Sequence, residues 1–153
     1  MSDITKILKQ QALVLLDEAL EEPTVPYCTF TDHEGLLPTL SRVTAQAASS
    51  ETSPGDPTST IAAHCEHLRF SAGVWSDWLR GSRESVDWSA SWTVSRVDEA
   101  GWKRLLSDLR EAFATARETV GSCDATTPQS VGGILSVAAH TAYHIGAIRQ
   151  KLP

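Results

Sequence analysis

The stretch from Asp98 to Gly121 constrains the fold of this chain most, because its apolar residues recur at helical spacing along its whole length. These residues are Trp102, Leu105, Leu106, Leu109, Phe113, Ala116 and Val120. Intervals of three and four residues place them on one face of a helix. Asp98 is a suitable side chain for capping the start of that helix. We therefore predict a long amphipathic helix over residues 98–121.

Two further segments of the chain show the same signals. Residues 3–21 place one apolar stripe on a helix, formed by Ile4, Ile7, Leu8, Leu15 and Ala19. Residues 59–81 predict a second long helix, with Thr58 or Ser59 as its cap and Gly81 at its stop. Residues 36–48 between them predict one short helix.

The last helix is expected from residue 127 to the C-terminus. Thr127 can cap it, and Pro128 suits the first helical position. Residues 131–148 contain no Lys, Arg, Asp or Glu. A helix without charge over that length is expected to be buried on most sides.

Four long helices predict an all-α fold, a four-helix bundle with long crossover connections. The first two connections between these helices are each long enough to run the length of the bundle, so either can be the crossover. Residues 88–94 alternate weakly and predict either a strand or an extended loop held by Trp88 and Trp92. A chain of 153 residues fits one domain, residues 1–153.

Composition narrows the class of protein. The three cysteines, Cys28, Cys65 and Cys123, show no paired spacing, and the first residues form no apolar export segment. We therefore expect a reduced, cytoplasmic protein. No run approaches about 18 uninterrupted apolar residues, so no membrane span is expected. The net charge of −6, without a Lys and Arg cluster, disfavours nucleic acid as a partner.

The histidines carry the main functional signal. Four of the five fall in two predicted helices: His64 and His67 in residues 59–81, and His140 and His144 in the last helix. Two histidines four residues apart lie one turn apart on one helix face and can both bind one divalent metal ion. His64 or His67 can supply a third ligand. Their levels along the helices match only if the two helices pack antiparallel.

A second interpretation of these histidines is structural. Histidines on an apolar helix face often are core residues with satisfied hydrogen bonds, and the sequence leaves that alternative open. The pair is also not a zinc-protease motif, because Thr141 stands where that motif has its glutamate base.

Three passages resemble the DinB/YfiT-like family of metal-dependent enzymes: TIAAHCEHL, DWSASW followed by VDEAGWKRLLSDL, and HTAYHIGAIRQ. The resemblance covers nearly the whole chain, although Ala147 stands where many members carry Gln. It implies a four-helix bundle with crossed connections and a divalent metal ion, nickel or zinc. It assigns His67, His140 and His144 as metal ligands and leaves His64 as an outer or substrate-facing group.

The resemblance also implies function and partners. Relatives include transferases and isomerases that use a low-molecular-weight thiol such as bacillithiol or mycothiol, and a homodimer is expected. The alternative is a non-catalytic metal-binding or stress-response module. Glu66 and His64 are candidate general bases, and Trp75 or Trp78 can line a cavity mouth. We predict that Cys65 packs in the core and that His33 lies in a solvated loop.

Overall fold

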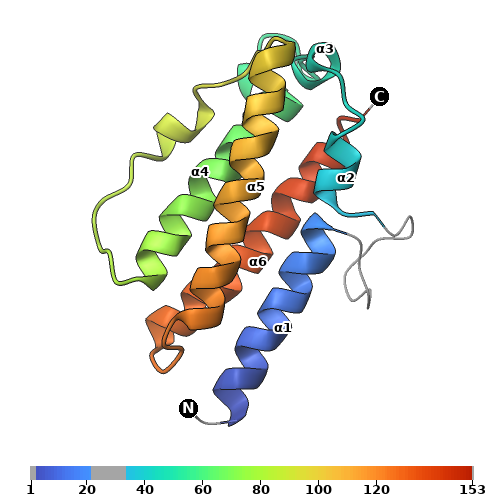
Figure 1. Ribbon diagram of the computed structural model, residues 1–153. Coiled ribbons are helices and arrows are strands. Elements are labelled where there is room, and N and C mark those ends of the chain that lie inside the picture. The colour runs from blue at the N-terminus through green and yellow to red at the C-terminus, as the bar shows by residue number, and fades with distance from the viewer. Residues whose placement is uncertain (1–2, 22–33, 153) are drawn as a thin grey trace.

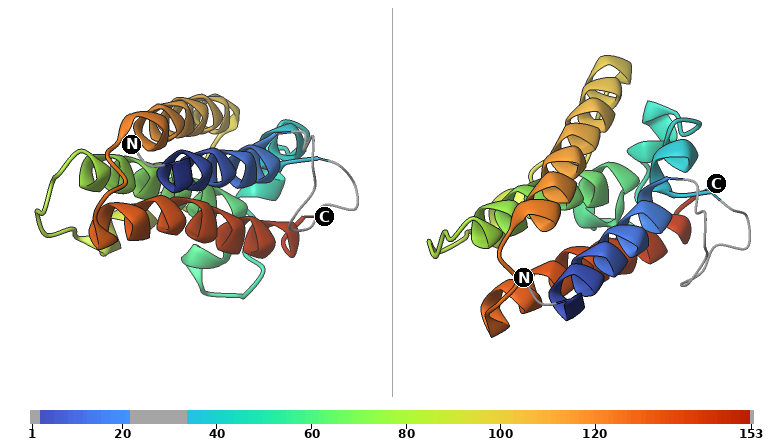
Figure 2. Two further views of the ribbon diagram at one scale, coloured as in Figure 1. Left: turned by 90° about the horizontal axis from the view of Figure 1, so that it is seen from below. Right: turned by 60° about the horizontal axis from the view of Figure 1, so that its bottom comes forward.

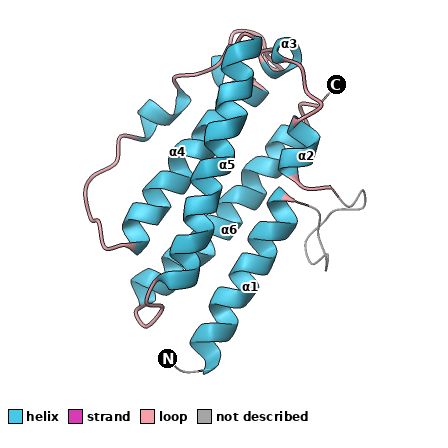
Figure 3. Cartoon of the chain, viewed as in Figure 1, coloured by secondary structure: helices cyan, strands magenta, loops and turns pink. Residues whose placement is uncertain are grey.

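The computed structural model describes residues 3–21 and 34–152 (Figure 1). The expectations for Cys28 and His33 lie outside these residues. Helices, turns and loops account for all of the described chain, which contains no strand (Figure 3). The predicted all-α class is therefore confirmed for the described residues.

Four long helices form most of the structure: α1 is Asp3–Leu20, α4 is Ile61–Leu79, α5 is Glu99–Ser122 and α6 is Pro128–Arg149. The shorter elements are α2, Leu36–Leu40, and α3, Ala45–Ala48, with the 3-10 helices η1, Pro57–Ser59, and η2, Trp88–Trp92. Each long helix agrees with a predicted one to within about one turn.

Side-chain caps fix where the two C-terminal helices begin. The Asp98 carboxylate accepts a hydrogen bond from the Gly101 amide at the start of α5. At α6, Thr127 and Ser130 each accept a hydrogen bond from the other's backbone amide, which forms a capping box. Both predicted caps, Asp98 and Thr127, are confirmed.

The start of α4 differs from the prediction. Thr60 caps it by accepting a hydrogen bond from the Ala63 amide, whereas Thr58 and Ser59 belong to η1. The reason is that the Asp56 carboxylate binds the Thr58 amide and starts a separate 3-10 turn before the helix. The predicted stop is confirmed, because Gly81 has a φ of 108°, a left-handed conformation that favours glycine.

Two predicted segments are corrected. Residues 36–48 form two short helices instead of one, because the Thr44 hydroxyl accepts a hydrogen bond from the Ala47 amide and caps a new helix there. Residues 88–92 form the 3-10 helix η2, neither a strand nor an extended loop. The Asp87 carboxylate accepts hydrogen bonds from the amide and hydroxyl of Ser89, which stabilises this turn.

Both α1 and α4 contact α5 and α6 (Figure 2). Helices α4 and α6 run in opposite directions, because His64 pairs with His144 and His67 with His140. In Figure 1, α4 ends at the lower end of the molecule and α5 begins at the upper end, so residues 80–98 run along the helices. Within this connection, η2 packs against α4.

A core of large aliphatic and aromatic side chains lies between the long helices. Its fully buried members include Leu16, Leu68, Leu109, Phe113, Ile134 and Ile145. Burying side chains of this size stabilises the fold by about 1.5–3 kcal/mol each. The histidine-bearing faces of α4 and α6 are continuous with this core, so the site is built on helices held by packing.

Helix α6 is the one described helix that is long and apolar enough to cross a membrane. Its 22 residues include an 18-residue window with a mean hydropathy of 1.2, of which 39% is buried against the rest of the chain. Core helices of globular proteins meet the same criterion. The membrane-free, cytoplasmic location expected from the sequence stays a prediction.

Candidate metal centre

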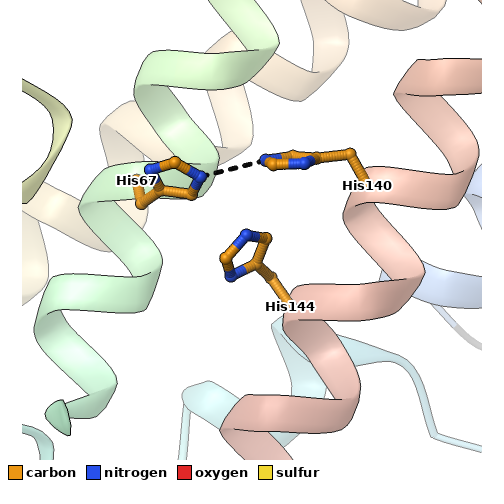
Figure 4. Close-up of side chains that lie close together, drawn as sticks. All are labelled: His67, His140 and His144. Atoms are coloured by element: carbon orange, nitrogen blue, oxygen red, sulfur yellow. Dashed lines mark hydrogen bonds between the residues drawn. The ribbon is translucent and has the colours of Figure 1, made fainter. Parts of the chain in front are cut away.

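Three of the predicted site residues meet between α4 and α6. Figure 4 shows the rings of His67, His140 and His144 directed toward one another. One ring nitrogen of each lies within 4.8 Å of the other two, a separation at which the three can hold one metal ion. The antiparallel packing of α4 and α6, which the metal hypothesis required, puts both helices at the right level.

The His67 ring is held at both nitrogens. Its Nε2 lies 3.1 Å from Nε2 of His140, on the side where the three rings converge. Its Nδ1 lies 2.7 Å from Oγ of Ser91 in η2, on the opposite side of the ring. Only one nitrogen of His67 therefore faces the centre of the cluster.

His144 has a partner behind it as well. Its Nδ1 lies 3.0 Å from Nδ1 of His64, one turn before His67 on α4. The Nε2 of His144 is consequently the nitrogen left for the centre. His64 stands behind His144, outside the group of three converging rings.

Two tryptophans of η2 cover one side of the histidine cluster. Trp92 stacks on His67, with ring centroids 4.2 Å apart and planes 16° apart, and meets His64 edge-on at 5.4 Å. Trp88 lies 6.0 Å from His67 and 6.5 Å from His140. The sequence had instead suggested Trp75 or Trp78 as lining residues.

The position of Trp78 explains why it does not lie beside the histidine cluster. Its ring lies beneath the Arg83 guanidinium, 4.0 Å from the ring centroid, and beside Gly133 at the start of α6. At about 1.5 Å per residue, Trp78 is roughly three turns along α4 from His67. The connection after α4 supplies the aromatic wall instead, because it folds back along the helix.

Exposure differs across the cluster. His67 and His144 are 6% and 5% exposed, whereas His140 is half-buried. Near the rings, Trp88 is 38% and Tyr143 is 72% exposed, and the Tyr143 ring contacts His144 edge-on at 5.0 Å. Of the three rings, that of His140 is therefore the most exposed to solvent.

Burial keeps these imidazoles uncharged at neutral pH. Loss of hydration disfavours the imidazolium and lowers the pKa of His64 and of His67 from 6.5 to about 4. The same effect, with repulsion from the neighbouring histidines, lowers the pKa of His144 to about 3. Burial also lowers the pKa of His140. Neutral imidazole is the form that binds a metal ion.

These shifts predict how the stability of the metal-free protein depends on pH. Between pH 6.5 and about 4 the unfolded histidines bind protons that the folded ones do not. The free energy of unfolding should therefore fall as the pH is lowered through this window. Urea denaturation at half-unit steps measures the slope, which His64→Ala should reduce. A stability that is flat from pH 6.5 to 4.5 would contradict these pKa shifts.

Other candidate groups stand apart from the rings. The Glu66 carboxylate binds Arg69 through two hydrogen bonds of 2.7 and 2.8 Å, so this candidate base is already engaged. Cys65 is fully buried in the core, as predicted, and burial raises the pKa of its thiol. Among the described Cys, Asp and Glu residues, none joins the three-histidine group.

An apolar groove of about 500 Å³ lies between α1 and α6, away from the histidines. Residues along it include Leu8, Leu15, Leu135, Ala138 and Ala142. In the described part of the chain, its lining includes no histidine, cysteine or carboxylate side chain, although Gln11 and Arg149 lie along it. The candidate metal ligands therefore lie outside this groove.

Ser91 is a site residue that was not predicted from the sequence. This serine is fully buried beneath His67, yet it comes from the connection between α4 and α5 and not from a histidine-bearing helix. The flanking Trp88 and Trp92 signalled that the segment packs against the protein. Nothing in the run WSASW distinguishes Ser91, which faces His67, from the exposed Ser89.

Comparison of the chain with protein-family models, with curated proteins and with solved structures gives no match. The resemblance to the DinB/YfiT-like family therefore rests on the sequence passages that carry it.

Proposed function

We propose that the chain is a divalent-metal-dependent enzyme whose metal ion is held by His67, His140 and His144. The observation that carries this proposal is the convergence of the three rings, each with one nitrogen directed to a common centre. His64 is proposed as the outer partner of His144. Metal-binding histidines regularly hydrogen bond through their second nitrogen, which orients the ring and raises its basicity.

The donor set fits a divalent transition metal. Two nitrogens bound to one tetrahedral ion at about 2.0–2.1 Å lie about 3.4 Å apart. His67 Nε2 and His140 Nε2 are 3.1 Å apart, so this pair is already close to that separation, and the three ligand atoms all lie within 4.8 Å of one another. Imidazole nitrogens suit zinc and nickel better than magnesium or calcium, which prefer oxygen. We propose nickel or zinc.

Ligand number and exposure favour a catalytic role. Three histidines leave a tetrahedral shell incomplete, and the described residues offer no fourth ligand in the group. Of the three rings, the half-buried one of His140 is the most exposed to solvent. With three neutral ligands, a divalent ion keeps its full charge and can lower the pKa of a bound water or thiol.

The alternative function is a non-catalytic bundle module with satisfied core histidines. It also expects the internal hydrogen bonds seen here, so these bonds do not separate the two hypotheses. The convergence of His144 on the same point as His67 and His140 favours metal binding, because it brings a third ring nitrogen to that point. A purely structural role has no need for a third ring at the same point.

We further propose membership of the DinB/YfiT-like family and its four-helix bundle with crossed connections. Support comes from the mutual contacts of the long helices and from residues 80–98, which run along them. A small molecule is the expected substrate, with a low-molecular-weight thiol as co-substrate. The homodimer implied by the resemblance remains a prediction.

Cobalt substitution tests both the metal site and the thiol. Protein purified without an affinity tag should bind one Co²⁺ per chain, because one cluster of three histidines is available. Adding a small thiol such as 2-mercaptoethanol should then produce a sulfur-to-cobalt charge-transfer absorption band, because a thiol can take the open coordination position.

The outcomes separate the hypotheses. The same titration of His140→Ala should give no band and serves as the matched control. Stoichiometric cobalt without a thiol response would remove the thiol-dependent branch and leave water activation as the remaining chemistry. If the wild-type protein does not bind stoichiometric cobalt, the non-catalytic bundle module remains as the function.

A further inference from the structure

Ser91 has a hydrogen-bond arrangement that fixes which nitrogen of His67 carries a proton. Its Oγ lies 2.6 Å from the Trp88 carbonyl oxygen and 2.7 Å from His67 Nδ1. A carbonyl oxygen cannot donate, so the short contact requires the single hydroxyl proton of Ser91 to point at Trp88. Ser91 Oγ must then accept from His67, and His67 carries its proton on Nδ1.

This assignment leaves the Nε2 lone pair of His67 free at the centre of the cluster. Nε2 is the nitrogen that lies 3.1 Å from His140. A neutral imidazole binds a metal ion only through its unprotonated nitrogen, and the hydrogen bond of the other nitrogen decides which one that is. The chain from the Trp88 carbonyl through Ser91 to His67 therefore prepares Nε2 as a ligand before any metal arrives.

From this geometry we infer that Ser91 is a positioning residue of the metal site, which holds His67 in its metal-binding tautomer. The inference rests on the proposed function for its metal-binding consequence, but the tautomer itself is a property of the metal-free protein. Ser91 is fully buried, so bulk solvent does not compete for its two hydrogen bonds. Trp92 stacks on His67 and restricts rotation of the same ring.

The pair formed by His67 and His140 then has a defined direction. Because His67 Nε2 has no proton, the 3.1 Å contact requires His140 to donate from its own Nε2. His140 must release that proton to solvent and take up another at Nδ1 before its Nε2 can bind a metal ion. His140 is half-buried, which gives solvent the access that this exchange needs.

Long-range proton–nitrogen NMR of the histidine rings at pH 7.5 tests the assignment without metal. In the metal-free wild-type protein, His67 should be protonated at Nδ1 and His140 at Nε2. Ser91→Ala removes the acceptor, so His67 should change to a mixture of tautomers or to the Nε2–H form. Ser91→Thr keeps a hydroxyl and should retain the wild-type pattern.

Ser89→Ala is the matched control, because it removes an exposed hydroxyl from the same turn, where Ser89 donates to Asp87. It should leave the His67 tautomer unchanged. In a competition titration with a chelator, Ser91→Ala should bind zinc about 10–100-fold more weakly than wild type, and Ser89→Ala should match wild type. Zinc should also move the His140 proton from Nε2 to Nδ1 without altering His67.

An Nε2–H tautomer of His67 in the wild-type protein would overturn the inference, whether or not Ser91→Ala folds. An unchanged His67 tautomer in folded Ser91→Ala would do the same. If the tautomer depends on Ser91 but wild-type protein binds no zinc, the proposed function fails and Ser91 loses its role toward a metal. The hydrogen-bond direction would still stand in that case.

Discussion

Replacing His140 or His144 with alanine should abolish stoichiometric metal binding while the far-ultraviolet helical signal survives. Either change removes one of three imidazole ligands, so the loss in affinity should exceed the 10–100-fold typical of outer hydrogen-bond partners. The helical signal should survive because the core residues of α6, including Ile134 and Ile145, stay buried. Metal analysis after dialysis, with circular dichroism on the same samples, measures both effects.

His144 needs a second variant because it is only 5% exposed. Truncating a large buried side chain typically costs about 2–5 kcal/mol, which can lower the melting temperature and obscure the loss of a ligand. His144→Phe keeps a ring in place and removes the ligand nitrogen. Leu135→Ala, at an exposed position of the same helix, is the control and should bind metal normally. Full metal occupancy in His140→Ala and in His144→Phe would show that the site is wrong.

His67→Ala and His64→Ala should differ sharply although the two residues lie one turn apart on α4. His67 presents Nε2 to the cluster centre, so its loss should abolish tight metal binding. His64 contacts His144 from behind, so its loss should weaken binding only by about 10–100-fold. Isothermal titration with zinc, by displacement from a chelator, measures this difference.

His64 and His67 are suitable controls for each other because burial affects their imidazoles similarly. Both residues are imidazoles on one helix, and both have a pKa lowered to about 4 by loss of hydration. Neither should be protonated at pH 7, so a difference in affinity reports ligand position and not charge. The reverse ranking would place the α4 ligand one turn earlier, at His64.

The two histidine pairs could be predicted from helix geometry, whereas the choice of His67 over His64 rested on the resemblance to a known family. A separation of four residues puts His140 and His144 on one face, and the apolar periodicity of α4 places His64 and His67 on its buried side. Equal levels along antiparallel helices then bring the two groups together. These relations depend on rise and rotation per residue, together with the antiparallel packing that the metal hypothesis required.

Local capping was predictable where a single side chain decides the boundary, as at Asp98 and Thr127. It was not predictable where neighbouring caps compete. Asp56, Thr58, Ser59 and Thr60 can each cap a turn, and the outcome depends on η1 forming ahead of α4. The break between α2 and α3 at Thr44 has the same origin.

The four long helices, their apolar faces and the histidines that those faces carry follow from short-range spacing, so they could be inferred before folding was considered. The atoms that surround the rings depend instead on how distant segments pack together. Ser91 and Trp92 reach His67 through η2, whose place beside α4 depends on how residues 80–98 pack along the helices. Contacts between residues distant in sequence leave no periodic pattern in the sequence. The hydrogen bond between His67 and Ser91 could therefore be identified only from the folded chain.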